Sequence, residues 1–264
     1  MILAVDVGNS SILLGCMDGL SVRHTMRLKT DRTMCAAQYF AALQALLAQN
    51  GYPAARFEGA ILSSVVAAVT APLRQALSSL FCGAVLVVGE TAKTMIPLRI
   101  DHPESIGADL IAAAEGALAQ YKPPLILIDM ETATTFSVLD QSSAFLGGAI
   151  APGLQLSAEA LAQRTGLPLS DLLPPHSALG ADTVDCLRSG TVLGAAAMVD
   201  GMLDRLEAAL GIPAPAIATG GLAGYVIPYC QHRILLGEAL LLRGLAVMYR
   251  RDPPPSSTSE SIPV

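Results

Sequence analysis

Apolar residues at the start of the chain occur in short runs that end in polar turns, which is the pattern of consecutive β-strands. A first run over 2–5 ends at Asp6, the polar turn 8–11 follows, and a second run occupies 12–16. Two apolar runs joined by a turn that contains glycine are typical of a β-hairpin. With a third short strand expected over 20–28, the chain is predicted to begin with three strands in succession.

Helical spacing of apolar residues appears next, and from there strands and helices alternate. Thr30 and Asp31 offer side-chain oxygens that can cap the first helix. The predicted elements are a helix over 36–49, a strand over 59–66, a helix over 69–80, a strand over 84–89 and a helix over 103–121. Because alternating strands and helices form parallel strand pairs, we expect a largely parallel sheet.

The second half of the chain repeats the layout of the first. A strand over 125–129 ends in Asp129, and a polar turn and a returning strand over 134–140 follow. Further expected elements are a glycine-rich turn over 147–153, a helix over 156–164, a long helix over 184–210, a strand entering the glycine turn 218–221, and a closing helix over 238–251. The repeat indicates two related domains, placed at 1–115 and 116–250, with a flexible tail over 251–264.

Composition narrows the class of protein. The chain has 264 residues, 52% apolar and 14% charged, so it can bury a core and does not resemble a disordered chain. No apolar run approaches the ~18 residues that a membrane span needs, and the N-terminus lacks the basic region of a signal peptide. A net charge of −6 without a basic run disfavours nucleic-acid binding. We therefore expect a cytoplasmic, soluble protein that binds a small molecule.

Cysteines and histidines are predicted to have no metal-binding role. Both types are widely scattered, and no CxxC pair occurs. We expect reduced thiols that mostly pack in the core. The cysteines are Cys16, Cys35, Cys82, Cys186 and Cys230.

Two strand-end turns carry the groups that phosphate chemistry needs. The turn after Asp6 offers backbone N–H groups to phosphate while the carboxylate holds Mg²⁺ through water, although the same residues also make ordinary β-turns. The turn after Asp129 adds threonine hydroxyls, and two such turns together favour a nucleotide site. The glycine turn 218–221 is either a nucleoside contact or a plain turn, and Asp109 is either functional or simply a favourable acid at a helix N-terminus.

Motifs in the same order along nearly the whole chain resemble those of type III pantothenate kinases, in the superfamily of acetate and sugar kinases, Hsp70 and actin. The motifs are DVGNSS at 6–11, Arg27 with Thr30 and Asp31, LSSVV at 62–66, PESIGAD at 103–109, DMETATTF at 129–136, GGAIAPGLQLSAEAL at 147–161, DTVDCLRSG at 182–190, ATGG at 218–221 and RGLAVMYR at 243–250. The resemblance implies an α/β fold of two ribonuclease-H-like, actin-like ATPase domains with a nucleotide cleft between them.

The resemblance also implies an activity and its site. ATP would phosphorylate pantothenate to 4′-phosphopantothenate, the first step of coenzyme A biosynthesis, in a homodimer. Asp109 matches the general base, Asp6 the residue that holds Mg²⁺ through water, and Asp129 the ligand of K⁺ or NH₄⁺. The implied ATP contacts are Asp6, Val7, Gly8, Asn9, Ser10, Ser11 and Thr132. The implied pantothenate contacts are Ile100, Gly107, Ala108, Asp109, Leu110 and Thr183.

Three positions depart from the family's pattern. Leu110 stands where the family usually has arginine, Ile100 where it has tyrosine, and Glu131 where the second phosphate turn has glycine. If Glu131 needs a positive φ, the strain costs about 1–2 kcal/mol. Its carboxylate would then repel phosphate, add a ligand to a cation beside Asp129, or point into solvent. A relative that binds nucleotide or a pantothenate-like ligand without catalysis, or that phosphorylates another acceptor, is the alternative to an active pantothenate kinase.

Overall fold

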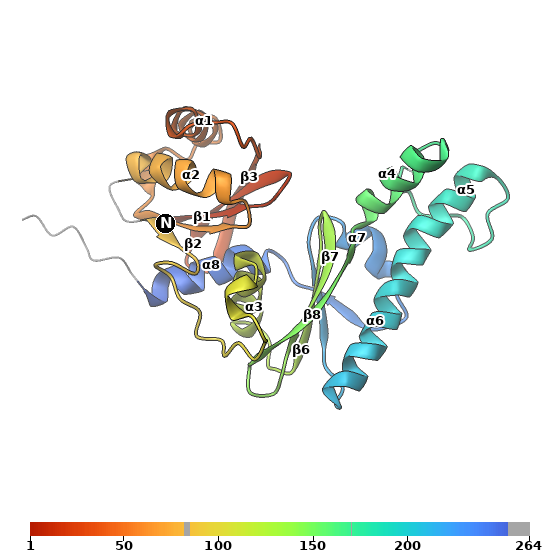
Figure 1. The fold of residues 1–264 in the computed structure, drawn as a ribbon. Helices are drawn as coiled ribbons and strands as arrows, with labels where there is room; N and C mark the ends of the chain where they lie inside the picture. Colours follow the sequence, from red (N-terminus) through yellow and green to blue (C-terminus); the bar gives the residue numbers. More distant parts are fainter. Residues whose placement is uncertain (82–84, 170, 253–264) are drawn as a thin grey trace, which may run out of the picture. The chain divides into compact units, whose positions relative to one another are not determined.

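The computed structural model describes residues 1–81, 85–169 and 171–252 (Figure 1). The chain divides into two compact units, each described here by itself. Unit 1 comprises Met1–Met95, Glu104–Ala119 and the segment from Leu240 onward, whereas unit 2 comprises Ile96–Pro103 and Gln120–Ala239. Cys82 and all but the first two residues of the predicted tail lie outside the described residues.

Unit 1 contains a five-stranded sheet in the order β3-β2-β1-β4-β5. Its strands are β1 (Ile2–Val7), β2 (Ser11–Asp18), β3 (Ser21–Lys29), β4 (Gly59–Ser64) and β5 (Val85–Val87). The first three strands are antiparallel neighbours, and only β1, β4 and β5 pair in parallel. The sheet is therefore mixed rather than largely parallel, because short turns between the first strands allow only antiparallel pairing.

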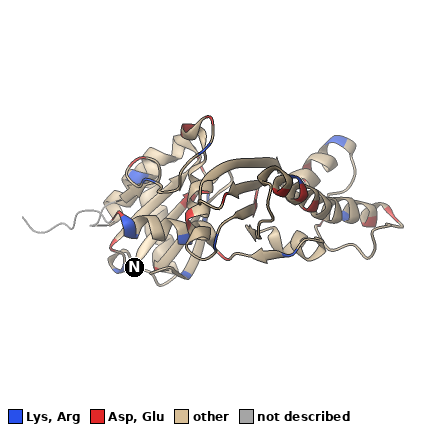
Figure 2. Ribbon diagram, turned by 90° about the horizontal axis from the view of Figure 1, so that it is seen from below, with Lys and Arg blue, Asp and Glu red and all other residues tan. Residues whose placement is uncertain are grey.

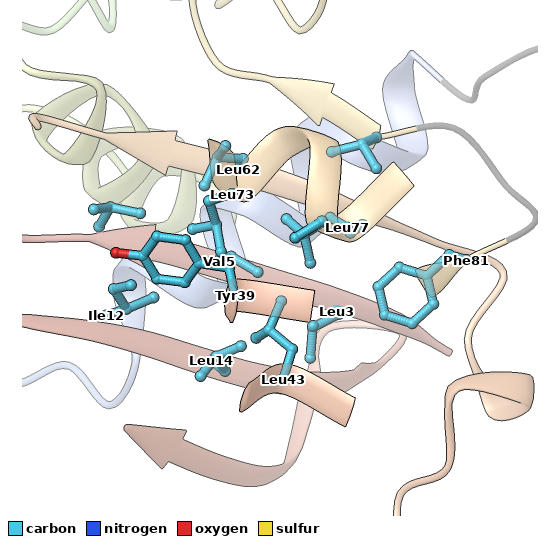
Figure 3. Close-up of a cluster of buried hydrophobic side chains, with 14 of the residues drawn as sticks. Leu3, Val5, Ile12, Leu14, Tyr39, Leu43, Leu62, Leu73, Leu77 and Phe81 are labelled. Atoms are coloured by element: carbon cyan, nitrogen blue, oxygen red, sulfur yellow. The ribbon is translucent and has the colours of Figure 1, made fainter. Parts of the chain in front are cut away.

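Helices cover both faces of this sheet. The helices are α1 (Ala36–Gln49), α2 (Ala67–Leu80), α3 (Ala108–Leu118) and α8 (Leu240–Arg251). Alternate residues of β1 point to opposite faces, and Leu3 and Val5 pack with Tyr39 of α1 and Leu73 of α2 (Figure 3). The other face is covered by α3 and α8. By the same alternation, Asp6 lies on the face that α3 and α8 cover.

The α3 and α8 helices approach each other at two glycines. A Cβ on Gly116 would lie 1.9 Å from the Leu240 carbonyl oxygen, and one on Gly244 would lie 1.7 Å from that of Ala112. Beside this crossing, the buried Glu115 accepts hydrogen bonds from Thr94 Oγ1 at 2.8 Å and from Arg251 Nη1 at 3.1 Å. Two sequence-distant helices are thus fixed to each other at backbone contact distance.

Unit 2 repeats this architecture. Its strands are β6 (Leu125–Met130), β7 (Ala133–Leu139), β8 (Phe145–Pro152), β9 (Ala216–Thr219) and β10 (Ile234–Leu236), and its helices are α4 (Leu154–Thr165), α5 (Thr183–Arg188), α6 (Gly194–Leu210) and α7 (Ala223–Val226). The order β8-β7-β6-β9-β10 matches that of unit 1 strand for strand. Asp6 and Asp129 are each the fifth residue of the first strand of their unit. The predicted α/β fold of two related halves is confirmed.

Several local predictions differ from the structure. The segment predicted as a glycine-rich turn forms β8, where a Cβ on Gly148 would lie 1.6 Å from the Phe136 carbonyl oxygen, so glycine permits the strand pairing. A π-helical turn over Ser189–Leu193 interrupts the predicted long helix. The strand β10 and the helix α7 were not predicted. In the structure α8 belongs to unit 1 and 96–103 to unit 2.

The residue that caps the N-terminus of α1 differs from the prediction. Its N-cap is Cys35, whose backbone N–H donates to Gln38 Oε1 at 2.9 Å. The predicted caps are engaged elsewhere, since Thr30 Oγ1 donates to the Gly8 carbonyl oxygen and Asp31 Oδ1 accepts from the Thr33 N–H.

Basic and acidic residues are mixed in the described part of the chain. Lys and Arg are interspersed with Asp and Glu along the ribbon (Figure 2). None of the helices in the described ranges combines the length and apolarity that a bilayer crossing requires.

The cysteines outside 82–84 are free thiols, and burial raises the pKa of Cys16 to about 11 and that of Cys230 to about 12. The buried Cys16 and the partly buried Cys230 are therefore poor nucleophiles at neutral pH.

Candidate active site

The turn after β1 is held in place by the segment that follows β3. The Gly8 N–H donates to the Ser11 carbonyl oxygen at 3.0 Å and closes the turn. Thr30 binds the turn twice, because its Oγ1 donates to the Gly8 carbonyl oxygen at 2.7 Å and its N–H to that of Ser10 at 3.2 Å. Asn9 and Ser10 are exposed at its tip. The turn therefore holds its backbone and hydroxyl groups in a fixed arrangement, with an exposed tip.

Asp6 is the carboxylate at the base of this turn. It pairs across the parallel strands with Ser63, a fully buried residue whose Oγ donates to Asp6 Oδ1 at 2.8 Å. Mg²⁺ in phosphoryl-transfer sites usually takes one or two carboxylates and completes its shell with water and phosphate oxygens. One oriented carboxylate beside a turn with an exposed tip fits that requirement. No group of three potential metal ligands occurs among residues 1–81, 85–169 and 171–252.

Asp109 occupies the first turn of α3, also in unit 1. Its Oδ1 accepts the Leu110 N–H at 2.8 Å, and a Cβ on Gly107 would lie 2.2 Å from the same oxygen. Glycine at the N-cap therefore makes room for the carboxylate. That Cβ position also lies 3.7 Å from Val65, just beyond the carboxyl end of β4. Burial raises the pKa of Asp109 above its ordinary value, and the hydrogen bond from Leu110 opposes the rise.

The turn after β6 meets the turn after β9 in unit 2. The Leu222 N–H donates to the Met130 carbonyl oxygen at 3.1 Å. Gly220 has a φ of +94°, and a Cβ there would lie 2.7 Å from Asp129 Oδ1. On the other side, the Gly153 N–H donates to the carbonyl oxygen of Thr132 at 3.2 Å. Asp129 and Thr132 thus stand where three chain segments meet at one edge of the sheet.

The Glu131 backbone lies outside the left-handed region, so the strain expected for a residue replacing glycine is absent. The alternative that its side chain points away into solvent is also wrong. Glu131 is only partly exposed, and its Oε1 accepts the Gly221 N–H at 2.9 Å. The carboxylate therefore joins the turn after β6 to the glycine turn after β9.

Comparison with known proteins assigns this architecture to a family. A sequence profile described as "Type III pantothenate kinase" matches residues 2–205, which is well over half of the chain. The chain belongs to the type III pantothenate kinase family. A type III pantothenate kinase from Exiguobacterium sp. is 38% identical over 96% of this chain and 99% of that protein. One from Thermus thermophilus is 42% identical, covering 93% of this chain and 97% of that protein.

Solved structures with low sequence identity share the fold of this family member. A putative Baf family transcriptional activator from Campylobacter jejuni superposes with a TM-score of 0.62 at 16% identity, over 95% of this chain and 98% of that one. A ROK hexokinase from Thermus thermophilus gives a TM-score of 0.52 at 17% identity, over 94% and 97%. These likenesses establish the two-domain α/β architecture.

The residues expected to contact pantothenate fall in both units of this type III pantothenate kinase family member. Gly107, Ala108, Asp109 and Leu110 are brought together at the start of α3. Ile100 lies in unit 2 beside β8, with its Cγ2 3.8 Å from a Cβ placed on Gly147. Thr183 also lies in unit 2, as the exposed first residue of α5.

Sequence analysis missed two side chains of the candidate site. Ser63 was not singled out as an Asp6 partner, although the serine pair inside the strand predicted over 59–66 was a usable signal. The contact of Arg32 with the turn 8–11, called the phosphate turn below, was missed as well. Its Nη2 donates to Asn9 Oδ1 at 3.1 Å, which no pattern within either segment reveals.

Proposed function

We propose that this chain transfers the γ-phosphate of ATP to the primary hydroxyl of pantothenate and forms 4′-phosphopantothenate, the first step of coenzyme A biosynthesis. The observation that carries the proposal is the placement of Asp109. Its carboxylate, with a pKa raised by burial, lies beside the segment that follows β4, on the sheet face and edge that also carry Asp6. Family membership supports the same reaction.

The phosphate turn and Asp6 would bind the polyphosphate of ATP. The turn from Val7 to Ser11 would contact phosphate oxygens through the N–H groups at its exposed tip and the side chains of Asn9, Ser10 and Ser11, as such turns do in other proteins. Asp6 would hold Mg²⁺ through water. The bound ion neutralises charge on the phosphates. In unit 2, Thr132 would contact ATP and Asp129 would hold K⁺ or NH₄⁺.

Asp109 would act as the general base. A carboxylate accepts the proton of the attacking hydroxyl in phosphoryl transfer. Gly107 and Ala108 would line the pantothenate site beside it, with Thr183 as a further contact. Leu110 and Ile100 would give that site apolar surface where the family usually has a cationic side chain and a phenol.

A coupled assay tests the proposal directly. Purified protein with ATP, Mg²⁺ and pantothenate should release ADP, and mass spectrometry should detect phosphopantothenate in equal amount. K⁺ or NH₄⁺ should stimulate the rate relative to Na⁺. ATP binding without any phosphopantothenate would contradict the proposed acceptor, and a screen of small hydroxylated acids would then search for another.

The enzyme is further proposed to be a homodimer that associates through unit 2. The edge strand β8 exposes Ile150 at 77%, and α4 and the segment after it expose further leucines, including Leu179 at 86%. Apolar surface gathered on one unit typically marks a protein interface. The other exposed apolar residues of this region are Leu146, Leu156, Leu161, Leu167, Leu169 and Leu173.

Ile150→Lys is expected to shift the protein from dimer to monomer at micromolar concentration. Losing about 2 kcal/mol of apolar burial per copy, or about 4 kcal/mol per dimer, raises the dissociation constant by about 10³-fold. Light scattering coupled to gel filtration would measure the mass. Met95→Lys is the matched control, because Met95 is 74% exposed in unit 1 and should leave the mass unchanged. A dimer that survives Ile150→Lys would exclude β8 from the interface.

A further inference from the structure

Two arginines of unit 1 contact the side chains of the phosphate turn. Arg27 Nη1 donates to Ser11 Oγ, and Arg32 Nη2 donates to Asn9 Oδ1, each at 3.1 Å. We propose that Arg27 and Arg32 bind the polyphosphate of ATP and add positive charge to its site beside that of Mg²⁺. This inference rests on the proposed function, because it takes the turn at 8–11 as the phosphate-binding element.

The turn itself has no cationic side chain. Residues 6–13 read DVGNSSIL and contain neither lysine nor arginine. Backbone N–H groups carry only partial charges, whereas the polyphosphate of ATP carries several full negative charges. A guanidinium offers five N–H donors in a planar fork that matches phosphate oxygens. The contacts to Ser11 and Asn9 therefore bring two such groups to the turn from outside it.

The segment that carries Arg32 is fixed on both sides. Thr30 makes its two hydrogen bonds to the turn, and the buried Tyr39 of α1 donates its hydroxyl to the Asp31 carbonyl oxygen at 2.7 Å. The Asp31 carboxylate accepts from the N–H and Oγ1 of Thr33 at 2.8 and 2.6 Å. Because the backbone on both sides of Arg32 is anchored, no further ordering of this backbone is needed when the guanidinium binds a ligand.

Charge in this region is positive on balance. Arg27 and Lys29 lie on the exposed side of β3, two residues apart, and Arg32 follows shortly after. Asp31 is the one carboxylate within residues 27–33. Arg27 and Arg32 are also exposed, which allows them to reach a ligand bound over the turn.

Calorimetric titration with ATP, ADP and AMP in the presence of Mg²⁺, without any acceptor, tests the proposal. The variants are Arg27→Gln, Arg32→Gln, the double variant and Arg32→Lys. Arg23→Gln is the matched control, because Arg23 is an exposed arginine of the same strand whose contact is an ion pair with Asp18 at 2.6 Å.

Each single glutamine variant should weaken ATP binding about 5- to 10-fold, and the double variant more than either. The loss should diminish from ATP to ADP to AMP, because each removed phosphate removes a charge. Arg32→Lys should recover part of the affinity, and Arg23→Gln should match the parent. A turn that had merely lost its shape would also weaken ATP more than AMP, because the turn itself binds phosphate. Arg32→Lys separates the two cases, since lysine should regain affinity only if the cationic group itself binds phosphate.

Unchanged ATP affinity in the double variant would overturn the assignment, as would an equal loss for all three nucleotides. A parent protein that binds no nucleotide would overturn both this inference and the proposed function. A parent that binds ATP with the expected dependence on both arginines, yet forms no phosphopantothenate, would overturn only the proposed acceptor.

Discussion

Asp109→Asn is expected to reduce kcat for pantothenate phosphorylation by about 10²- to 10⁴-fold, the usual contribution of a general base. Asparagine has nearly the same shape as aspartate, and its Oδ1 can still accept the Leu110 N–H that Asp109 Oδ1 accepts at 2.8 Å. The change therefore removes the proton acceptor while it keeps the start of α3. Initial rates of ADP release would measure the loss, and ATP affinity should stay close to that of the parent.

The pH profile provides a second readout of the same residue. Burial raises the pKa of Asp109, and only the ionised carboxylate can take the hydroxyl proton. Activity should therefore rise with pH through a pKa above the ordinary value for aspartate, and this acid limb should disappear in Asp109→Asn. The free energy of unfolding should fall as the pH rises through the raised pKa of Asp109, because ionisation of a carboxyl whose folded-state pKa is raised opposes folding.

The Asn variant should accordingly unfold at a temperature no lower than the parent at pH 7. A variant that keeps full activity would show that the proton leaves by another route. A variant that loses activity together with thermal stability would indicate damage to α3 instead of loss of a base.

Much of the fold could be predicted because its signals are local. The strand that ends in Asp6 and the strand that ends in Asp129 each consist of an apolar run, an acid and a turn of glycine or hydroxyl residues, and both occupy the same place in sheets of identical order. Strand β8 escaped prediction because Gly147 and Gly148 ordinarily mark a turn. Only the closeness of the Phe136 backbone explains why a glycine is needed inside that strand.

The candidate site was less predictable, because its contacts join distant segments. Glu131 and Gly221 are 90 positions apart, and the hydrogen bond between them decides the orientation of the Glu131 side chain. The sequence showed that a residue other than glycine at position 131 would be strained if its φ were positive. It could not give the φ of Glu131 or the hydrogen-bond partner of its side chain. Similarly, the partner of Asp6 depends on the register between β1 and β4, which aligns Asp6 with Ser63. Local patterns thus locate acids at strand ends, whereas strand pairing determines what those acids contact.

Gly116→Ala is expected to lower the free energy of unfolding of unit 1 by about 3 kcal/mol or more, the upper part of the usual range for overpacking. Helix propensity alone predicts the opposite sign, a gain of about 0.8–1 kcal/mol, because alanine favours helix over glycine. Packing decides the outcome. The new Cβ would lie 1.9 Å from the Leu240 carbonyl oxygen and 2.8 Å from the Gly244 nitrogen, and both contacts are with backbone that no rotamer change can move.

The same substitution should also lower kcat, since α3 carries Asp109 in its first turn and cannot move away from α8 without moving that carboxylate. Calorimetric unfolding and initial rates would be measured on one preparation. Gly194→Ala is the matched control, because Gly194 begins α6 in unit 2 and a Cβ there meets nothing within 4 Å. The control should be neutral or slightly stabilising. If Gly116→Ala behaved like Gly194→Ala, then α3 and α8 could separate at little cost, and their backbone contact would not be what holds the Asp109 helix in place.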